Sequence, residues 1–192
     1  MKRTISLAIT GAGAALLVLI SAPAARASES LWNALEQGGH VVLLRHAATV
    51  PGSGDPPGFR LDDCRTQRNL SADGRRDAQR LGADFRRRRI VLNEVLTSQW
   101  CRCRDTAQLA FGKSSPWPAL NSFFDNPAAS GPPSDEVRRR IAAFSGPGTL
   151  VLVTHQVNIT ALTGLVPAMG EMLVLLPTPA GGRVLGRIPP PQ

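Results

Sequence analysis

Short apolar runs alternate along the chain with longer stretches in which apolar residues recur every three or four positions. The short runs predict strands at residues 40–44, 91–97, 149–154, 172–176 and 183–188. The longer stretches predict helices at residues 31–36, 72–89, 102–111, 134–144 and 158–163. Strands that alternate with helices indicate a parallel sheet with helices on both faces. We therefore expect an α/β domain, a three-layer sandwich with a mostly parallel central sheet flanked by helices.

Polar and turn-forming residues mark where these elements begin and end. Ser71 and Ser134 are expected to cap the helices that follow them, and Gly112 is expected to end the helix before it. Two segments, residues 47–69 and 114–133, are rich in proline and turn residues, so no long regular element can run through them. Long loops in a compact domain are usually functional or disordered. Because the first loop begins directly after a predicted strand, we expect it to form a wall or lid of a site.

The first 27 residues have the pattern of a secretory signal peptide. Lys2 and Arg3 form a short basic region, residues 5–20 are mostly apolar, and Ala25-Arg26-Ala27 provides the small-residue pattern that signal peptidase cleaves. An uncleaved membrane anchor is less well supported, because the apolar stretch is shorter than the ~20 residues of a membrane span and contains glycines. We expect a mature domain of residues 28–192 that is periplasmic or secreted, without stable membrane insertion.

The chain is basic, with a formal charge of +8 that falls to +5 once the signal peptide is removed. Much of this charge lies on one predicted helix, which carries Arg75, Arg76, Arg80, Arg86, Arg87, Arg88 and Arg89. Clustered arginine can bind the phosphates of nucleic acids. Asp73, Asp77 and Asp84 lie on the same helix, however, so a solvated and ion-paired face is the simpler interpretation. Together with the export signal, this favours a protein without a nucleic-acid partner.

Three cysteines are present, Cys64, Cys101 and Cys103. In an oxidising compartment two of them are expected to form a disulfide and to leave one thiol over. Cys101 and Cys103 are too close in sequence to bridge easily, so Cys64 is expected to pair with one of them. A zinc site is the alternative, but a Cys-x-Cys pair without further ligands at zinc spacing is weak evidence. We expect no metal and no other cofactor.

Histidine and arginine lie at the ends of three predicted strands. Arg45 and His46 follow the first strand, Arg102 lies just beyond the second, and His155 follows the third. Because the carboxyl ends of parallel strands meet at one edge of a sheet, these four side chains are expected to share one pocket. The remaining histidine, His40, is at the opposite end of its strand and is expected to be structural.

A pocket of this composition suits phosphoryl transfer. The planar guanidinium of arginine donates paired hydrogen bonds to phosphate. A neutral imidazole can attack phosphorus through one ring nitrogen when the other nitrogen donates to a fixed acceptor. His46 is the expected nucleophile, and Arg45, Arg102 and His155 are expected to bind phosphate and to stabilise the charge that builds during transfer. Such a pocket can work without a metal.

Four segments resemble, in the same order, motifs of the histidine phosphatase superfamily, the group that contains the phosphoglycerate mutase-like phosphatases. Residues 44–49 are similar to the L-R-H-G-x-T motif, and residues 69–79 to the L-(S/T)-x-x-G-x-x-Q/A segment. Residues 98–107 are similar to S-x-x-x-R-x-x-x-T-A, and residues 153–155 to the second histidine after a strand. The resemblance covers about residues 40–165 and implies a phosphoglycerate mutase-like fold.

The resemblance also implies an activity, that of a metal-independent phosphatase with a phosphohistidine intermediate on His46. It assigns phosphate binding to Arg45, Arg102 and His155, and Thr49 is expected to add a hydroxyl near the phosphate. The partner is then a small phosphorylated molecule. With the export signal, the expected function is that of an exported phosphomonoester phosphatase.

The sequence departs from the motifs of the family at three points. Ala47 stands where glycine is usual, and Gly52 stands where many members carry asparagine. The proton donor of the family is a carboxylate that has no firm motif here, and Asp125 is the first candidate. The alternatives are Asp55, Asp62, Asp63 and Glu171. These departures leave a second hypothesis, a catalytically weak or inactive module of the same fold that binds phosphate or another anion.

Overall fold

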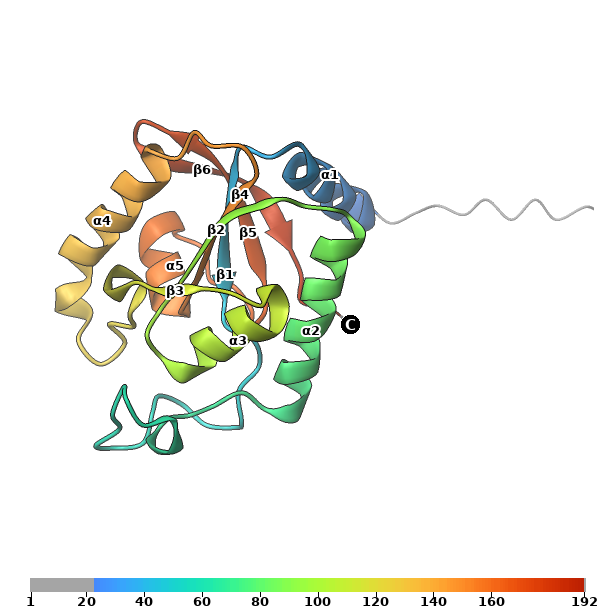
Figure 1. The fold of residues 1–192 in the computed structure, drawn as a ribbon. Coiled ribbons are helices and arrows are strands. Elements are labelled where there is room, and N and C mark those ends of the chain that lie inside the picture. The colour runs from blue at the N-terminus through green and yellow to red at the C-terminus, as the bar shows by residue number, and fades with distance from the viewer. Residues whose placement is uncertain (1–22, 192) are drawn as a thin grey trace, which may run out of the picture.

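One mixed sheet of six strands forms the centre of the molecule in the computed structural model, which describes residues 23–191 (Figure 1). The strand order is β3-β2-β4-β1-β5-β6. The strands are β1 (His40–Arg45), β2 (Leu92–Thr97), β3 (Ser115–Pro116), β4 (Thr149–Thr154), β5 (Met172–Thr178) and β6 (Gly181–Ile188). The pairs β1–β4, β2–β4 and β2–β3 are parallel, whereas β5 is antiparallel to both of its neighbours. The expected α/β class and mostly parallel sheet are confirmed.

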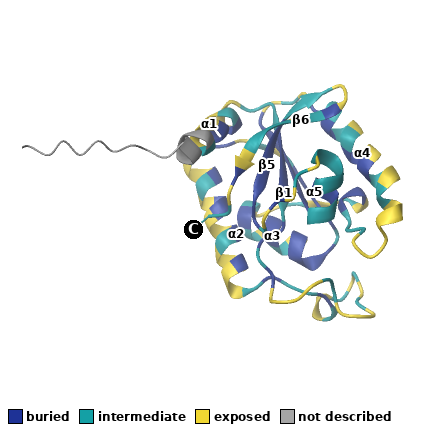
Figure 2. Ribbon diagram, turned by 180° about the vertical axis from the view of Figure 1, so that it is seen from behind, coloured by how far each residue is buried: buried dark blue, intermediate teal, exposed yellow. Residues whose placement is uncertain are grey.

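Five helices cover the two faces of this sheet. They are α1 (Pro23–Gln37), α2 (Ala72–Arg87), α3 (Cys101–Phe111), α4 (Gly131–Ala142) and α5 (Gln156–Thr163). Side chains of α1, α2 and α3 pack on one face of the sheet, and those of α4 and α5 pack on the other. Successive residues of a strand point to opposite faces, so in β1 Val42 and Leu44 join the first core and Val41 and Leu43 join the second. Burial on both faces explains why the central strands are unbroken apolar runs (Figure 2).

Two helices begin elsewhere than the sequence predicts. Helix α1 starts at Pro23 rather than near residue 31, because the alanine-rich residues before Ser28 also favour a helix. Helix α4 starts at Gly131, so Ser134 lies inside the helix and does not cap it. Pro132 and Pro133 occupy the first turn, where the missing N–H groups cost no hydrogen bond. Ser71, by contrast, caps α2 as expected, since its hydroxyl accepts from the Gly74 N–H at 3.0 Å.

The segment between β1 and α2 is irregular apart from a 3₁₀ turn at Cys64–Thr66. Cys64 forms a disulfide with Cys101, the first residue of α3, so Cys101 rather than Cys103 is the partner. Cys103 is a buried free thiol. The disulfide therefore ties this loop (residues 46–71, the β1–α2 loop) to the helix that carries Arg102.

A glycine brings the loop and α2 together at their other junction. A Cβ atom at Gly74 would lie 1.9 Å from the carbonyl oxygen of Ala48, far inside the contact distance. Any larger residue would push the start of α2 away from the segment that follows His46. The glycine of the second motif is thus required by backbone packing.

The arginines of α2 form ion pairs along the helix. Arg76 pairs with Asp73, Arg80 with Asp77, and Arg87 with Asp84, each one helical turn away. This is the arrangement of a solvated, charge-paired face. Within residues 23–191, no helix is both long enough and apolar enough to cross a membrane. Most of the predicted signal peptide, residues 1–22, lies outside the described residues.

Candidate active site

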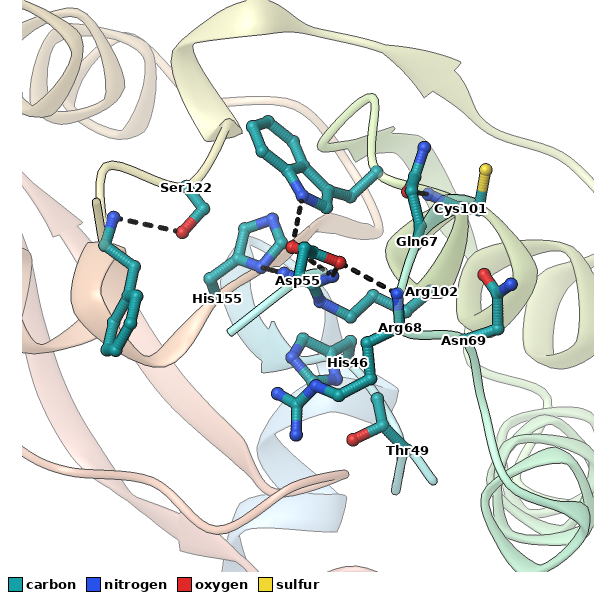
Figure 3. A network of polar contacts seen from close by, with 12 residues as sticks. His46, Thr49, Asp55, Gln67, Arg68, Asn69, Cys101, Arg102, Ser122 and His155 are labelled. Atoms are coloured by element: carbon teal, nitrogen blue, oxygen red, sulfur yellow. Dashed lines mark hydrogen bonds and ion pairs between the residues drawn. The ribbon is translucent and has the colours of Figure 1, made fainter. Parts of the chain in front are cut away.

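A cavity of about 240 Å³ opens where β1, β2 and β4 end. Arg45 and His46 enter it from the end of β1, Trp100 and Arg102 from the segment after β2, and His155 from the end of β4. Figure 3 shows His46, Arg102 and His155 in this cavity. The other lining residues are Gly52, Ser53, Gly54, Asp55, Arg68, Ser122, Phe124, Asp125, Gln156, Val157 and Met169. The structure thus brings together the four residues that the strand ends predicted.

His46 is held as a neutral imidazole with one defined tautomer. Its side chain is buried, and its Nδ1 lies 2.9 Å from the carbonyl oxygen of Ala47, which can only accept a hydrogen bond. Nδ1 therefore carries the proton, and the lone pair is on Nε2. Burial, reinforced by the charges of Arg102 and Arg45, lowers the pKa of His46 to about 3. At neutral pH the Nε2 lone pair is available to attack phosphorus.

His155 lies next to His46, with ring centroids 5.5 Å apart. Its Nε2 is 2.8 Å from the Ser98 hydroxyl, and its Nδ1 is 3.4 Å from Nη2 of Arg102. The Ser98 hydroxyl is also 3.3 Å from Oδ1 of Asn121, so it can donate to either partner. Nη2 of Arg102 can only donate, so its contact with Nδ1 fits the tautomer in which Nε2 carries the proton and donates to Ser98. When Ser98 instead donates to Nε2, the proton is on Nδ1, from where it can form a hydrogen bond to an anion in the cavity. Burial and the nearby His46 hold the pKa of His155 well below its ordinary value, so this ring is also neutral.

Arg102 forms a buried ion pair with Asp55 of the β1–α2 loop. The Arg102 Nη1 atom lies 2.7 Å and 3.0 Å from the two Asp55 oxygens, and both side chains are only 5% exposed. Asp55 also accepts hydrogen bonds from Nε1 of Trp100 and from the backbone N–H of Arg68, each at 2.9 Å. Burial alone would raise the pKa of Asp55, but the hydrogen bonds from Arg102 and these neighbours outweigh burial and lower the pKa. Asp55 is therefore a stable carboxylate, and such a group is a poor proton donor.

Arg68 is a third guanidinium in the cavity that sequence reasoning missed. The one indication in the sequence is that Arg68 directly precedes the second motif. It lies in an irregular loop, however, and no periodic pattern predicts where the side chains of such a loop point. Burial and the charge of Arg102 lower the pKa values of both Arg45 and Arg68, and the two residues also repel each other. The Nε atoms of Arg45, Arg68 and Arg102 are buried without a hydrogen-bond acceptor in the described part of the chain. Three guanidinium groups with unmet donors around one cavity suit an anion.

Thr106, the threonine of the third motif, connects two parts of the site through its hydroxyl. Its hydroxyl accepts from the backbone N–H of Ala47 at 3.0 Å and donates to the carbonyl oxygen of Arg102 at 2.7 Å. One hydroxyl therefore links the backbone beside His46 to the backbone of Arg102. This contact fixes the distance between two elements that are far apart in sequence.

The carboxylates considered as proton donors are in different places. Asp125 lines the mouth of the cavity, is exposed, and forms no hydrogen bond or ion pair with any described residue. Asp63 pairs with Arg65 outside the cavity. Asp62 is exposed, and Glu171 binds Arg187.

Two further expectations concern Thr49 and His40. Thr49 does not line the cavity, and its hydroxyl points to the sulfur of Met169 at 3.7 Å. His40 lies at the far end of β1, where its Nδ1 is 2.7 Å from the carbonyl oxygen of Gly38. Among residues 23–191, no group of three or more His, Cys, Asp or Glu side chains is placed to hold a metal ion.

Comparison with known proteins identifies the family to which this site belongs. Residues 41–121 match the sequence profile of the histidine phosphatase superfamily (branch 1). This part of the chain is therefore similar in sequence to the histidine phosphatase superfamily. It contains His46, Arg102 and three of the four motifs, while His155 lies beyond it. No curated protein matches the sequence.

Solved structures share the fold over most of the chain. A protein from Agrobacterium tumefaciens, assigned as the phosphohistidine phosphatase SixA, is 23% identical, with a TM-score of 0.52; the match covers 80% of this chain and 99% of that one. A protein from Escherichia coli, assigned as an alpha-ribazole-5'-P phosphatase, is 17% identical, with a TM-score of 0.55 and coverage of 76% and 94%. The protein histidine phosphatase SixA in complex with tungstate is 14% identical, with a TM-score of 0.50 and coverage of 78% and 96%. The phosphoglycerate mutase-like fold of these histidine phosphatases is therefore the fold of this chain.

The buried neutral histidines make stability depend on pH. In the unfolded chain each histidine takes up a proton near pH 6.5, whereas His46 and His155 stay neutral in the folded protein. The unfolding free energy should therefore fall as pH decreases from 6 to 4.5, by about 1.4 kcal/mol per pH unit for each of these histidines. Urea unfolding at several pH values measures this slope. His46→Asn should reduce the slope by about 1.4 kcal/mol per pH unit, and a variant with the wild-type slope would contradict the neutral, buried state of His46.

Proposed function

We propose that this protein is a phosphatase that hydrolyses phosphomonoesters through a phosphohistidine intermediate on His46. The proposal is carried by one observation, the neutral His46 whose Nδ1 is held by a carbonyl oxygen while Arg45, Arg102 and His155 surround the same cavity. Phosphoryl transfer requires a nucleophile that is not protonated, which neutral His46 provides. It also requires hydrogen-bond donors for the charged phosphoryl oxygens, which the surrounding side chains provide.

The reaction proceeds in two displacements. The Nε2 lone pair of His46 forms a bond to phosphorus while the ester P–O bond breaks and its electrons leave with the alcohol oxygen. Asp125 gives that oxygen a proton. Water then attacks the phosphohistidine, Asp125 takes a proton from the water, and the N–P bond breaks to release phosphate and restore neutral His46. Throughout, Arg45, Arg102 and His155 donate hydrogen bonds to the phosphoryl oxygens.

The structural relatives support this chemistry without specifying the substrate. All three of the relatives described above carry phosphatase names, and one SixA structure contains tungstate, a tetrahedral oxyanion shaped like phosphate. A small phosphorylated molecule is the partner that fits this fold.

A second candidate function is anion binding with little or no turnover. The observation that favours it is the lack, among the described residues, of a buried, unpaired carboxylic acid in the cavity, since Asp125 is exposed at the mouth and Asp55 is paired with Arg102. In this case the cavity would still bind phosphate or vanadate. The test of the intermediate distinguishes the two candidates.

Replacement of the nucleophile should remove the intermediate. When the protein turns over a ³²P-labelled phosphomonoester and is quenched with detergent at alkaline pH, label should remain on the wild type and be absent from His46→Asn. Hydrolysis by the variant should fall at least about a thousandfold, as is typical when a covalent nucleophile is lost. His40→Asn, which alters a histidine outside the cavity, is the matched control and should keep both label and turnover. Tight vanadate binding without label or hydrolysis on a broad substrate panel would favour the anion-binding candidate instead.

Loss of the proton donor should affect substrates according to their leaving groups. Asp125→Asn should lower kcat on an alkyl phosphate by roughly 10²-fold to 10⁴-fold, because an alkoxide cannot leave without a proton. On 4-nitrophenyl phosphate, whose leaving group is stable as an anion, the rate of the first displacement, measured as the burst of 4-nitrophenolate, should change little. Asp62→Asn, an exposed carboxylate outside the cavity, is the control and should leave both rates unchanged. Equal losses in the rate of the first displacement on both substrates would remove Asp125 from the role of proton donor.

We also propose that the protein is exported and cleaved after Ala27. The support is the signal-like pattern of residues 1–27 together with the Cys64–Cys101 disulfide, a bond that persists in oxidising compartments. The cleavage would leave in place the part of α1 that packs in the core through Leu31, Trp32 and Leu35.

Expression of the full chain in a bacterial host checks the export proposal. The protein recovered from the periplasm or medium should begin at Ser28 and, after unfolding without a reductant, should show one reactive thiol, that of Cys103. A protein that retains Met1 in the membrane fraction would contradict cleavage. Three reactive thiols in the exported protein would contradict the disulfide.

A further inference from the structure

Asp55 is an acidic side chain placed among the cationic side chains of the phosphate cavity. It comes from the β1–α2 loop, and the turn before it contains Gly52 and Gly54 with φ values of 135° and 66°, which only glycine adopts readily. The loop is fixed further along by the Cys64–Cys101 disulfide. Asp55 is thereby held between Arg102, Trp100 and the backbone of Arg68 (Figure 3).

The charges around the cavity are unequal. Arg45, Arg68 and Arg102 are cations, and both histidines are neutral. The carboxylates that line the cavity are Asp125, which is exposed at the mouth, and Asp55, whose side chain is only 5% exposed. Asp55 thus offsets about a third of the positive charge that an entering phosphate meets.

Asp55 occupies one part of Arg102 and leaves the rest for a ligand. Both of its oxygens bind Nη1 of Arg102. Nη2 has only the long contact of 3.4 Å to His155, and Nε has no acceptor in the described part of the chain. A phosphate on Arg102 would then lie within about 5 Å to 6 Å of the Asp55 carboxylate, since both anions would contact one planar guanidinium group.

Two opposite effects follow from this placement. Asp55 orients Arg102, which favours phosphate binding, but the negative charge of Asp55 repels the phosphate. At 5 Å and an effective dielectric constant near 20, the repulsion between a carboxylate and even a singly charged phosphate exceeds the gain from orienting one guanidinium group. Repulsion is therefore the larger effect.

We propose that Asp55 is a built-in counter-anion that limits how tightly the cavity holds phosphate. This inference rests on the proposed function, because it assumes that phosphate binds in this cavity at Arg102. In a phosphatase, the consequence is faster release of the inorganic phosphate product, because a cavity with three unopposed guanidinium groups would retain it. Asp55 is a positioning residue in this scheme, since it acts on phosphate through Arg102 and through its charge.

Calorimetric titration with inorganic phosphate tests the sign of the effect. Asp55→Asn removes the charge and keeps the shape of the side chain, and phosphate should bind this variant roughly tenfold to a hundredfold more tightly than the wild type. Asp55→Ala should also bind phosphate more tightly, and this second variant covers the case in which the amide disturbs the contact with Trp100. Asp63→Asn is the matched control, because Asp63 is an ion-paired aspartate of the same loop outside the cavity, and its affinity for phosphate should equal that of the wild type.

Weaker or unchanged phosphate binding in both Asp55 variants would overturn the inference and leave Asp55 only the role of holding Arg102. Steady-state kinetics with added phosphate provides a second readout, in which inhibition by the product should strengthen by the same factor. The outcome is separable from that of the proposed function. The binding experiment does not need turnover, and the absence of label on His46 would refute the phosphatase while leaving the change in affinity intact.

Discussion

The parallel pairing of β1, β2 and β4 is the constraint on which the site depends. β4 lies between the other two strands, and the registers place Arg45 opposite Thr154 and Thr97 opposite Val153. The next residues are fixed by the same ladder, since the N–H of His46 donates to Thr154 and that of Ser98 donates to Val153. His46, Ser98 and His155, each about fifty positions from the next in sequence, are thereby brought side by side at the carboxyl edge of the sheet. A change of register by one residue would turn these side chains to the opposite face of the sheet.

Burial gives the histidines their chemistry and lowers the stability of the protein at acidic pH. An imidazole removed from water and placed beside guanidinium groups stays neutral, as a nucleophile must. The same environment disfavours the protonated state that the unfolded chain adopts freely below pH 6.5. The tautomer of His46 is then fixed by a neighbour rather than by charge, through the Ala47 carbonyl, whereas the Ser98 hydroxyl can pair with either tautomer of His155.

Sequence patterns predicted the parts of this molecule that depend on periodicity and on strand ends. The central strands and the grouping of His46, Arg102 and His155 followed from buried apolar runs that end in polar residues. The start of α4 was predicted wrongly, because Ser134 resembles a cap while the prolines before it fit the first turn equally well. Asp55 and Arg68 could not be placed, since their positions depend on how an irregular loop folds back over the sheet edge.

That loop is a structural part of the site rather than a free lid. It is attached to the rest of the protein by the disulfide at Cys64, by the ion pair of Asp55 with Arg102, and by the hydrogen bond that the Ala47 N–H donates to the Thr106 hydroxyl of α3. The strand ends supply two neutral imidazoles and two guanidinium groups, whereas the loop supplies one more guanidinium and a carboxylate. Because the loop adds one positive and one negative side chain, it changes how charge is distributed around the cavity and leaves the net charge of the cavity unchanged. The sheet therefore determines which reaction the cavity can support, and the loop determines how firmly an anion is held there.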